Sequence, residues 1–93
     1  MSADPAALLL RALRRCAIEA GCAAVLAHEA ETPWASATFV GARHRVRVTG
    51  DALDGWLDAL PEIDLPMRGH FVAGCDVGRT GTGATLTLLV LEG

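Results

Sequence analysis

Apolar and polar side chains alternate along residues 34–49, a period of two that is typical of β-strands. The alternation is interrupted at Gly41-Ala42, and glycine at the first position of a two-residue loop suits a type II′ turn. We therefore predict a hairpin that reverses at residues 41–42, with Val40 opposite Arg43. Its buried face would carry Ala35, Ala37, Phe39, Val46 and Val48. Its other face would carry Trp34, Val40, Arg43, Arg45 and Arg47.

Two amphipathic helices are predicted on either side of this hairpin. Residues 4–20 open with an Asp-Pro pair suited to a helix start, repeat apolar positions at spacings of three and four, and precede Gly21, a good helix end. The second helix is predicted to have its N-cap at Asp51 and to end at Pro61, because apolar residues of 53–60 share one helical face. Three acidic residues would form a solvated side of it: Asp54, Asp58 and Glu62.

Residues 67–77 and 84–91 show the alternation of two further strands, joined by a glycine-rich loop. In the first of them, Phe71 and Cys75 would point to the core. The opposite face would carry Arg68, His70 and Val72.

Residues 22–30 fit either a strand or a continuation of the first helix, and the strand is favoured because Val25 and Leu26 would then join the sheet. The elements predict an α+β fold: a mainly antiparallel sheet of four or five strands with two helices on one face. The order is α-β-β-β-α-β-β, or α-β-β-α-β-β if residues 22–30 are helical. With 93 residues, 52% of them hydrophobic, the chain from 1 to 93 is expected to be a single domain.

Net charge and cysteine usage indicate which partners and which cellular compartment to expect. A net charge of −3 argues against general polyanion binding, although all eight cationic residues are arginine. Lys, Asn, Gln and Tyr are absent, which indicates a GC-rich bacterial coding sequence. Three cysteines without C-x-x-C spacing favour a reducing compartment, and neither a signal peptide nor a membrane span fits the N-terminal pattern. We expect a cytoplasmic protein with no membrane attachment.

No motif in the sequence meets the requirements of a catalytic or metal site. The loop from Gly78 to Gly83 has phosphate-loop spacing but lacks the Lys-Ser/Thr pair and precedes a strand rather than a helix. The histidines and cysteines lack zinc-ligand spacing. We therefore predict no catalytic residue, no cofactor and no metal. One enzyme hypothesis stays open, a cleft lined by His44, His70 and Cys75.

The predicted function rests on the helix-free face of the sheet. The residues expected to bind a partner or ligand there are Trp34, Arg43, Arg45, Arg47, Arg68, His70, Leu89 and Leu91. We expect a non-catalytic homodimer that also binds a protein partner or small ligand. The dimer contact would use five apolar residues of this face: Trp34, Val40, Val72, Leu89 and Leu91. The alternative is a nucleic-acid-binding protein that uses the arginine-rich hairpin, with Trp34 as the one aromatic residue on that face.

Overall fold

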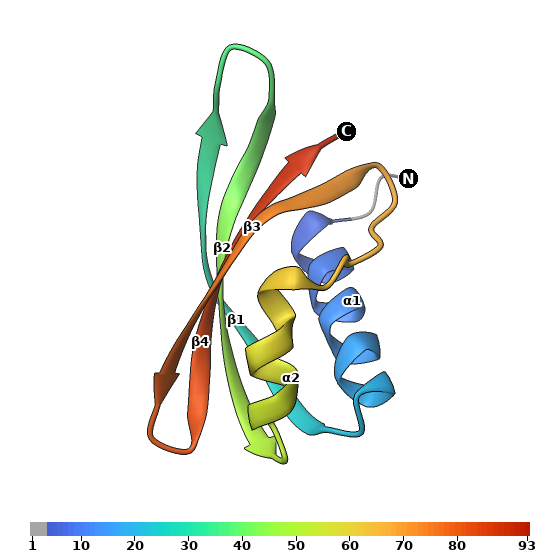
Figure 1. Cartoon of the computed structure of the whole chain (residues 1–93). Helices are drawn as coiled ribbons and strands as arrows, with labels where there is room; N and C mark the ends of the chain where they lie inside the picture. Colours follow the sequence, from blue (N-terminus) through green and yellow to red (C-terminus); the bar gives the residue numbers. More distant parts are fainter. Residues whose placement is uncertain (1–3) are drawn as a thin grey trace.

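The computed structural model describes residues 4–93, which form one antiparallel sheet with both helices on the same side of it (Figure 1). In chain order the elements are α1 (Pro5–Glu19), β1 (Ala23–Ala35), β2 (Val40–Asp51), α2 (Asp54–Ala59), the 3-10 turn η1 (Leu60–Glu62), β3 (His70–Thr80) and β4 (Gly83–Glu92). The strand order is β1-β2-β4-β3, so β1 and β3 are the edges. The predicted α+β class is confirmed, in the order α-β-β-α-β-β. Among residues 4–93, no helix has the length and apolar character of a membrane span.

The first helix has the predicted capping. Asp4 Oδ1 accepts a hydrogen bond from the Ala6 N–H at 3.2 Å, and Pro5 is the first helical residue. After the helix, Gly21 has a φ of 79°, in the left-handed region that glycine adopts readily. The apolar side of α1 is buried against the sheet through Leu9, Ala12, Leu13 and Ala17.

The predicted hairpin exists, but its turn is at residues 36–39 and the prediction of a turn at Gly41-Ala42 is wrong. The Ser36 N–H donates to the Phe39 carbonyl at 2.8 Å, and the Ser36 hydroxyl accepts from the N–H groups of Thr38 and Phe39. Gly41 instead lies within β2, paired with Trp34 on one side and Leu91 on the other. A side chain on Gly41 would collide with the Val90 carbonyl oxygen, so glycine serves a close approach of strands rather than a turn.

The position of the turn changes both the strand count and the buried face. Residues 23–30 are a strand, as favoured, but the strand continues to Ala35, so there are four strands rather than five. Val46 and Val48 are fully buried, as predicted. The other three residues expected on the buried face of the hairpin are exposed, at or beside the turn: Ala35, Ala37 and Phe39.

The face prediction for β3 is wrong at its start because the strand contains a bulge. The register with β4 shifts between Val72 and Gly74, and one extra residue reverses the alternation. Val72 therefore packs against the core on the helix side, together with Cys75. Phe71, expected in the core, is 38% exposed on the opposite face.

The second helix begins later than predicted. Asp51 is the last residue of β2, paired with Ala23, so it does not cap the helix. The N-cap is Leu53, which makes no side-chain capping hydrogen bond. α2 and η1 contribute Trp56, Leu57 and Leu60 to the core.

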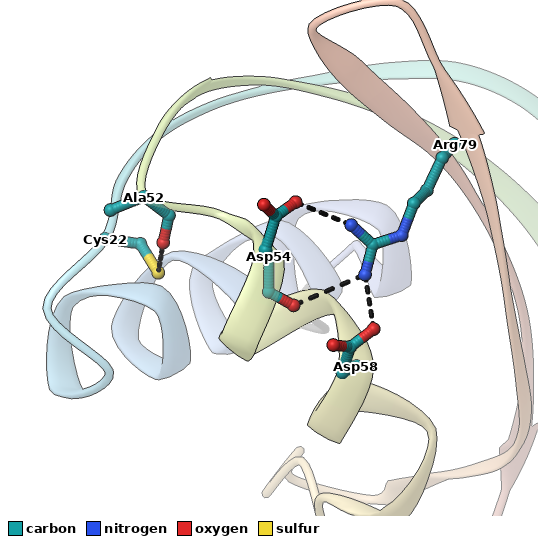
Figure 2. A network of polar contacts seen from close by, with 5 residues as sticks. All are labelled: Cys22, Ala52, Asp54, Asp58 and Arg79. Carbon is teal, nitrogen blue, oxygen red and sulfur yellow. Dashed lines mark hydrogen bonds and ion pairs between the residues drawn. The ribbon is translucent and has the colours of Figure 1, made fainter.

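An arginine from β3 ties α2 to the sheet (Figure 2). Arg79 Nη1 donates to Asp54 Oδ1 at 2.6 Å, while Nη2 donates to the Asp54 backbone carbonyl at 3.3 Å and to the Asp58 carboxylate. The side of α2 that was expected to be only solvated is therefore partly paired within the chain. At the other end of the same region, the Cys22 thiol donates to the Ala52 carbonyl at 3.1 Å.

Candidate functional site

The helix-free side of the sheet, here called the open face, carries a line of arginines along its second strand. Arg43, Arg45 and Arg47 are exposed and recur every second residue, about 6.7 Å apart along a strand. Glu29 on the neighbouring strand lies 2.6 Å from Arg47 Nη2 and 3.6 Å from Arg45 Nε. Arg43 has no ion-pair partner among residues 4–93. We call these three residues the arginine stripe.

Three aromatic side chains lie at one end of the open face, Trp34 on one edge strand and Phe39 with Phe71 towards the other. Trp34, Gly41, Leu91 and Phe71 form one row across the four strands. Phe39, from the hairpin turn, packs edge-to-face on Phe71 with ring centroids 5.6 Å apart. Leu91 is only 4% exposed, and its side chain occupies the space beside Gly41. We call Trp34, Phe39 and Phe71 the aromatic cluster.

The structure brings six of the eight predicted binding residues to the open face and places two elsewhere. The six are Trp34, Arg43, Arg45, Arg47, Leu89 and Leu91. Arg68 lies before β3 and lines a hollow beside α1 that also includes Arg11. His70 lies on the helix side, where it lines a small cavity with His44.

Sequence reasoning missed two members of the aromatic cluster, Phe39 and Phe71, which are 40% and 38% exposed. Both were assigned to the core, Phe39 because of the misplaced turn and Phe71 because of the bulge. The signal for the true turn is Ser36, since a serine hydroxyl can accept from N–H groups two and three residues later.

A second constellation lies on the helix side of the same hairpin. His28, Glu31 and His44 each offer a ligand atom, and all three atoms lie within 4.8 Å of one another. Residues 28 and 31 would face opposite sides of a regular strand. The register of β1 shifts between His28 and Ala30, and this bulge brings Glu31 to the same side as His28. Glu31 is paired directly with His44 across the hairpin. We call the three residues the histidine cluster.

His44 is the buried centre of this cluster. Its Nδ1 lies 2.9 Å from His28 Nε2 and 3.6 Å from Glu31 Oε1. Its Nε2 is buried and has no hydrogen-bond partner among the described residues. Burial lowers the pKa of His44, and the Glu31 carboxylate acts in the opposite direction. The imidazole of His44 is therefore neutral near pH 7.

His70 adjoins the cluster through a cavity of about 130 Å³ that is also lined by Pro5, Glu31, His44 and Glu92. The ring nitrogen Nδ1 of His70 lies 3.0 Å from the Arg68 carbonyl. A carbonyl can only accept, so Nδ1 carries the proton and Nε2 keeps its lone pair when the ring is neutral. All three histidines of the chain thus lie near one end of the helix side.

The position of Cys75 does not support a catalytic pair with His44. Leu88 lies between His44 and Cys75 in the same row of the sheet, which separates the two residues by about 10 Å. A thiol and its general base must be within hydrogen-bonding distance. Burial also raises the pKa of Cys75 to about 11, so its thiol is protonated at neutral pH.

Comparison of the chain with protein-family models, with curated proteins and with solved structures finds no match.

Proposed function

We propose that this protein is a non-catalytic binding module whose open face holds single-stranded nucleic acid. The observation that carries the proposal is the aromatic cluster lying beside the arginine stripe on one uncovered sheet face. Exposed aromatic rings on a sheet stack with unpaired bases, and nearby arginines meet the phosphates. The sequence indicated Trp34 as the one aromatic residue on this face, whereas Phe39 and Phe71 also lie on it.

Local charge supports this occupant in spite of the net charge of −3. The three arginines stand in the middle of the sheet, whereas Glu29 and Asp76 flank them from the two edge strands. Glu29 holds Arg45 and Arg47 along the face, and Arg43 is free to pair with an anion. The spacing of the stripe is comparable to that between successive phosphates of an extended single strand.

A second copy of this chain is the other candidate occupant, favoured by the exposure of Phe39 and Phe71 on the same face as Trp34. Fewer apolar residues favour a dimer through the open face than the sequence indicated. Val40 and Val72 lie on the other side of the sheet, and Leu91 is already covered within the chain. A two-fold contact through the open face would also bring two arginine stripes together.

The cellular compartment is part of the same proposal. All three cysteines are free thiols, and with the GC-rich coding pattern they favour a bacterial cytoplasm.

The direct test is the fluorescence anisotropy of a labelled oligouridylate titrated with protein at about 50 mM salt, where phosphate contacts are strong. We expect saturable binding that weakens as salt increases. Trp34→Ala should reduce affinity about tenfold, since stacking on one aromatic ring contributes about 1–3 kcal/mol. Arg43→Ala should lower the slope of log affinity against log salt by about 0.7.

Arg14→Ala is the matched control, because Arg14 is an exposed arginine of α1 on the other side of the sheet. It should leave both affinity and salt slope unchanged. Absence of binding at about 50 mM salt, or equal losses in the Arg43 and Arg14 variants, would exclude the open face as a nucleic-acid surface.

A further inference from the structure

We infer that His28, Glu31 and His44 form a binding site for a divalent transition-metal cation of the zinc type. The site lies on the helix side of the β1-β2 hairpin, away from the open face, and does not depend on the function proposed above. It was not expected from the sequence, because the ligand spacing is set by the hairpin register and the bulge in β1 rather than by a local motif.

The distances between donor atoms match coordination by one ion. Two atoms that are each about 2.1 Å from an ion lie about 3.0 Å apart at a right angle and about 3.4 Å apart at a tetrahedral angle. The distance from His44 Nδ1 is 2.9 Å to His28 Nε2 and 3.6 Å to Glu31 Oε1. These two distances are close to the expected ones, and all three donor atoms lie within 4.8 Å of one another, so a small movement of the exposed Glu31 side chain can bring the donors around one cation.

The burial of His44 fixes the ring in the orientation in which Nδ1 faces His28 and Glu31. A fully buried imidazole with an unpartnered Nε2 loses about 1–3 kcal/mol relative to a paired group. Leucine would fill a core position between Val46 and Ala42 without that penalty. When Nδ1 binds a cation the ring carries its proton on Nε2, so the penalty at Nε2 remains; the observation that favours an imidazole here is that Nδ1 faces His28 and Glu31. The core then holds the ring in a fixed orientation, which favours coordination.

The cluster is also accessible. The Glu31 side chain is 46% exposed, so a hydrated cation can reach it first from solvent. His28 lies on the edge strand β1 and is partly buried. The adjoining cavity of about 130 Å³ has room for water molecules that complete the coordination.

The donor set selects the class of metal. Two imidazole nitrogens and one carboxylate oxygen suit zinc, cobalt, nickel or copper, whereas calcium and magnesium require mainly oxygen ligands. Three protein ligands with further positions left to water is a ligand set that zinc proteins use.

The test is the thermal unfolding midpoint of the purified protein with excess Zn²⁺ and with a chelator. We expect Zn²⁺ to raise the midpoint by about 5 °C or more, because a ligand that binds only the folded state stabilises it. His28→Ala and Glu31→Gln should each remove most of this shift. Glu62→Gln, the same change at an exposed glutamate of η1, should keep it. Glu31 is exposed enough that its variant will fold even if His28→Ala does not.

Cobalt distinguishes this site from the free thiols. Co²⁺ bound to histidine and glutamate gives visible d–d absorption without the near-ultraviolet charge-transfer band of a thiolate ligand. We expect that spectrum at one Co²⁺ per chain, and its loss in Glu31→Gln. No change of the midpoint with Zn²⁺, a shift that survives both substitutions, or a thiolate band with Co²⁺ would each overturn the inference.

Discussion

Neighbouring residues of β2 face opposite sides of the sheet, so a single strand serves both candidate sites. Arg43 and Arg45 point to the open face, while His44 between them is fully buried on the helix side. This division follows from the period of two, and the sequence alone predicts it for the arginines and for Val46 and Val48. The sequence pattern did not predict the role of His44, because that role depends on the partners of His44 in β1.

The chemistry of Cys75 gives a prediction at the same scale. Its pKa is raised from 9.0 to about 11 by burial, with Asp76 adding to the effect. At pH 8 the thiolate fraction is then about a hundredfold lower than that of an unperturbed thiol. We expect alkylation of Cys75 by iodoacetamide to be slower by about that factor in folded than in urea-unfolded protein, followed by peptide mass spectrometry.

The same shift has a consequence at alkaline pH. A pKa that is higher in the folded state favours folding while the thiol is protonated, and this contribution is lost as the pH rises from about 9 towards 11. Cys75→Ser removes the titrating group and should flatten that part of the stability profile. Alkylation of folded Cys75 at the rate of the unfolded chain would contradict the burial of this thiol.

At the scale of elements, the position of one turn decides both candidate sites. With the turn at Ser36–Phe39, Trp34 lies opposite Gly41 and Glu31 opposite His44. A turn at Gly41-Ala42 brings neither pair together. The presence of both helices, the strands after residue 40 and the face of the arginines were predictable from periodicity, whereas the start of α2 was not. The turn was not, because two segments of the hairpin have suitable turn chemistry and only pairing with β4 selects between them.

The two bulges were also beyond local sequence reasoning. One in β1 brings Glu31 to the side of His28, and one in β3 brings Phe71 to the open face. A bulge reverses the alternation on which face assignment depends. Whether a bulge stabilises the fold depends on the partner strand and on the core, and the residue pattern of one strand shows neither.

Gly41 allows a test of the observed register. A methyl group at residue 41 would meet the Val90 carbonyl oxygen and the backbone of Leu91 in the middle of the sheet. We expect Gly41→Ala to lower the free energy of unfolding by about 1–3 kcal/mol, the usual effect of overpacking. Urea denaturation followed by the fluorescence of buried Trp56 would measure it.

Gly74→Ala is the matched control for this change. Gly74 is also a strand glycine, but an added methyl group there has no heavy atom within 4 Å. Its substitution should change the free energy of unfolding by less than about 0.5 kcal/mol. Equal effects of the two substitutions would contradict the close approach of β2 and β4 at Gly41.

At the scale of the whole molecule, the sheet divides the protein into two chemically different sides. Both helices lie on one side of the sheet (Figure 1), and the histidine cluster lies on that side too. The aromatic cluster and the arginine stripe lie on the other side. The net charge of −3 is a sum over both sides and does not describe the local charge of the open face. Ion pairs such as Arg79 with Asp54 and Asp58 neutralise part of the charge near α2.

The occupant of the open face determines the mass of the protein in solution. We expect a monomer of 9.7 kDa when no nucleic acid is present, because like charges of two arginine stripes oppose a two-fold contact. The edges also disfavour pairing between sheets, since β1 carries Pro33 and both edge strands contain a bulge. Light scattering after size exclusion, over a hundredfold range of concentration, measures this directly. A doubled mass that Trp34→Asp with Leu89→Asp returns to one chain would show instead that a second copy covers the open face.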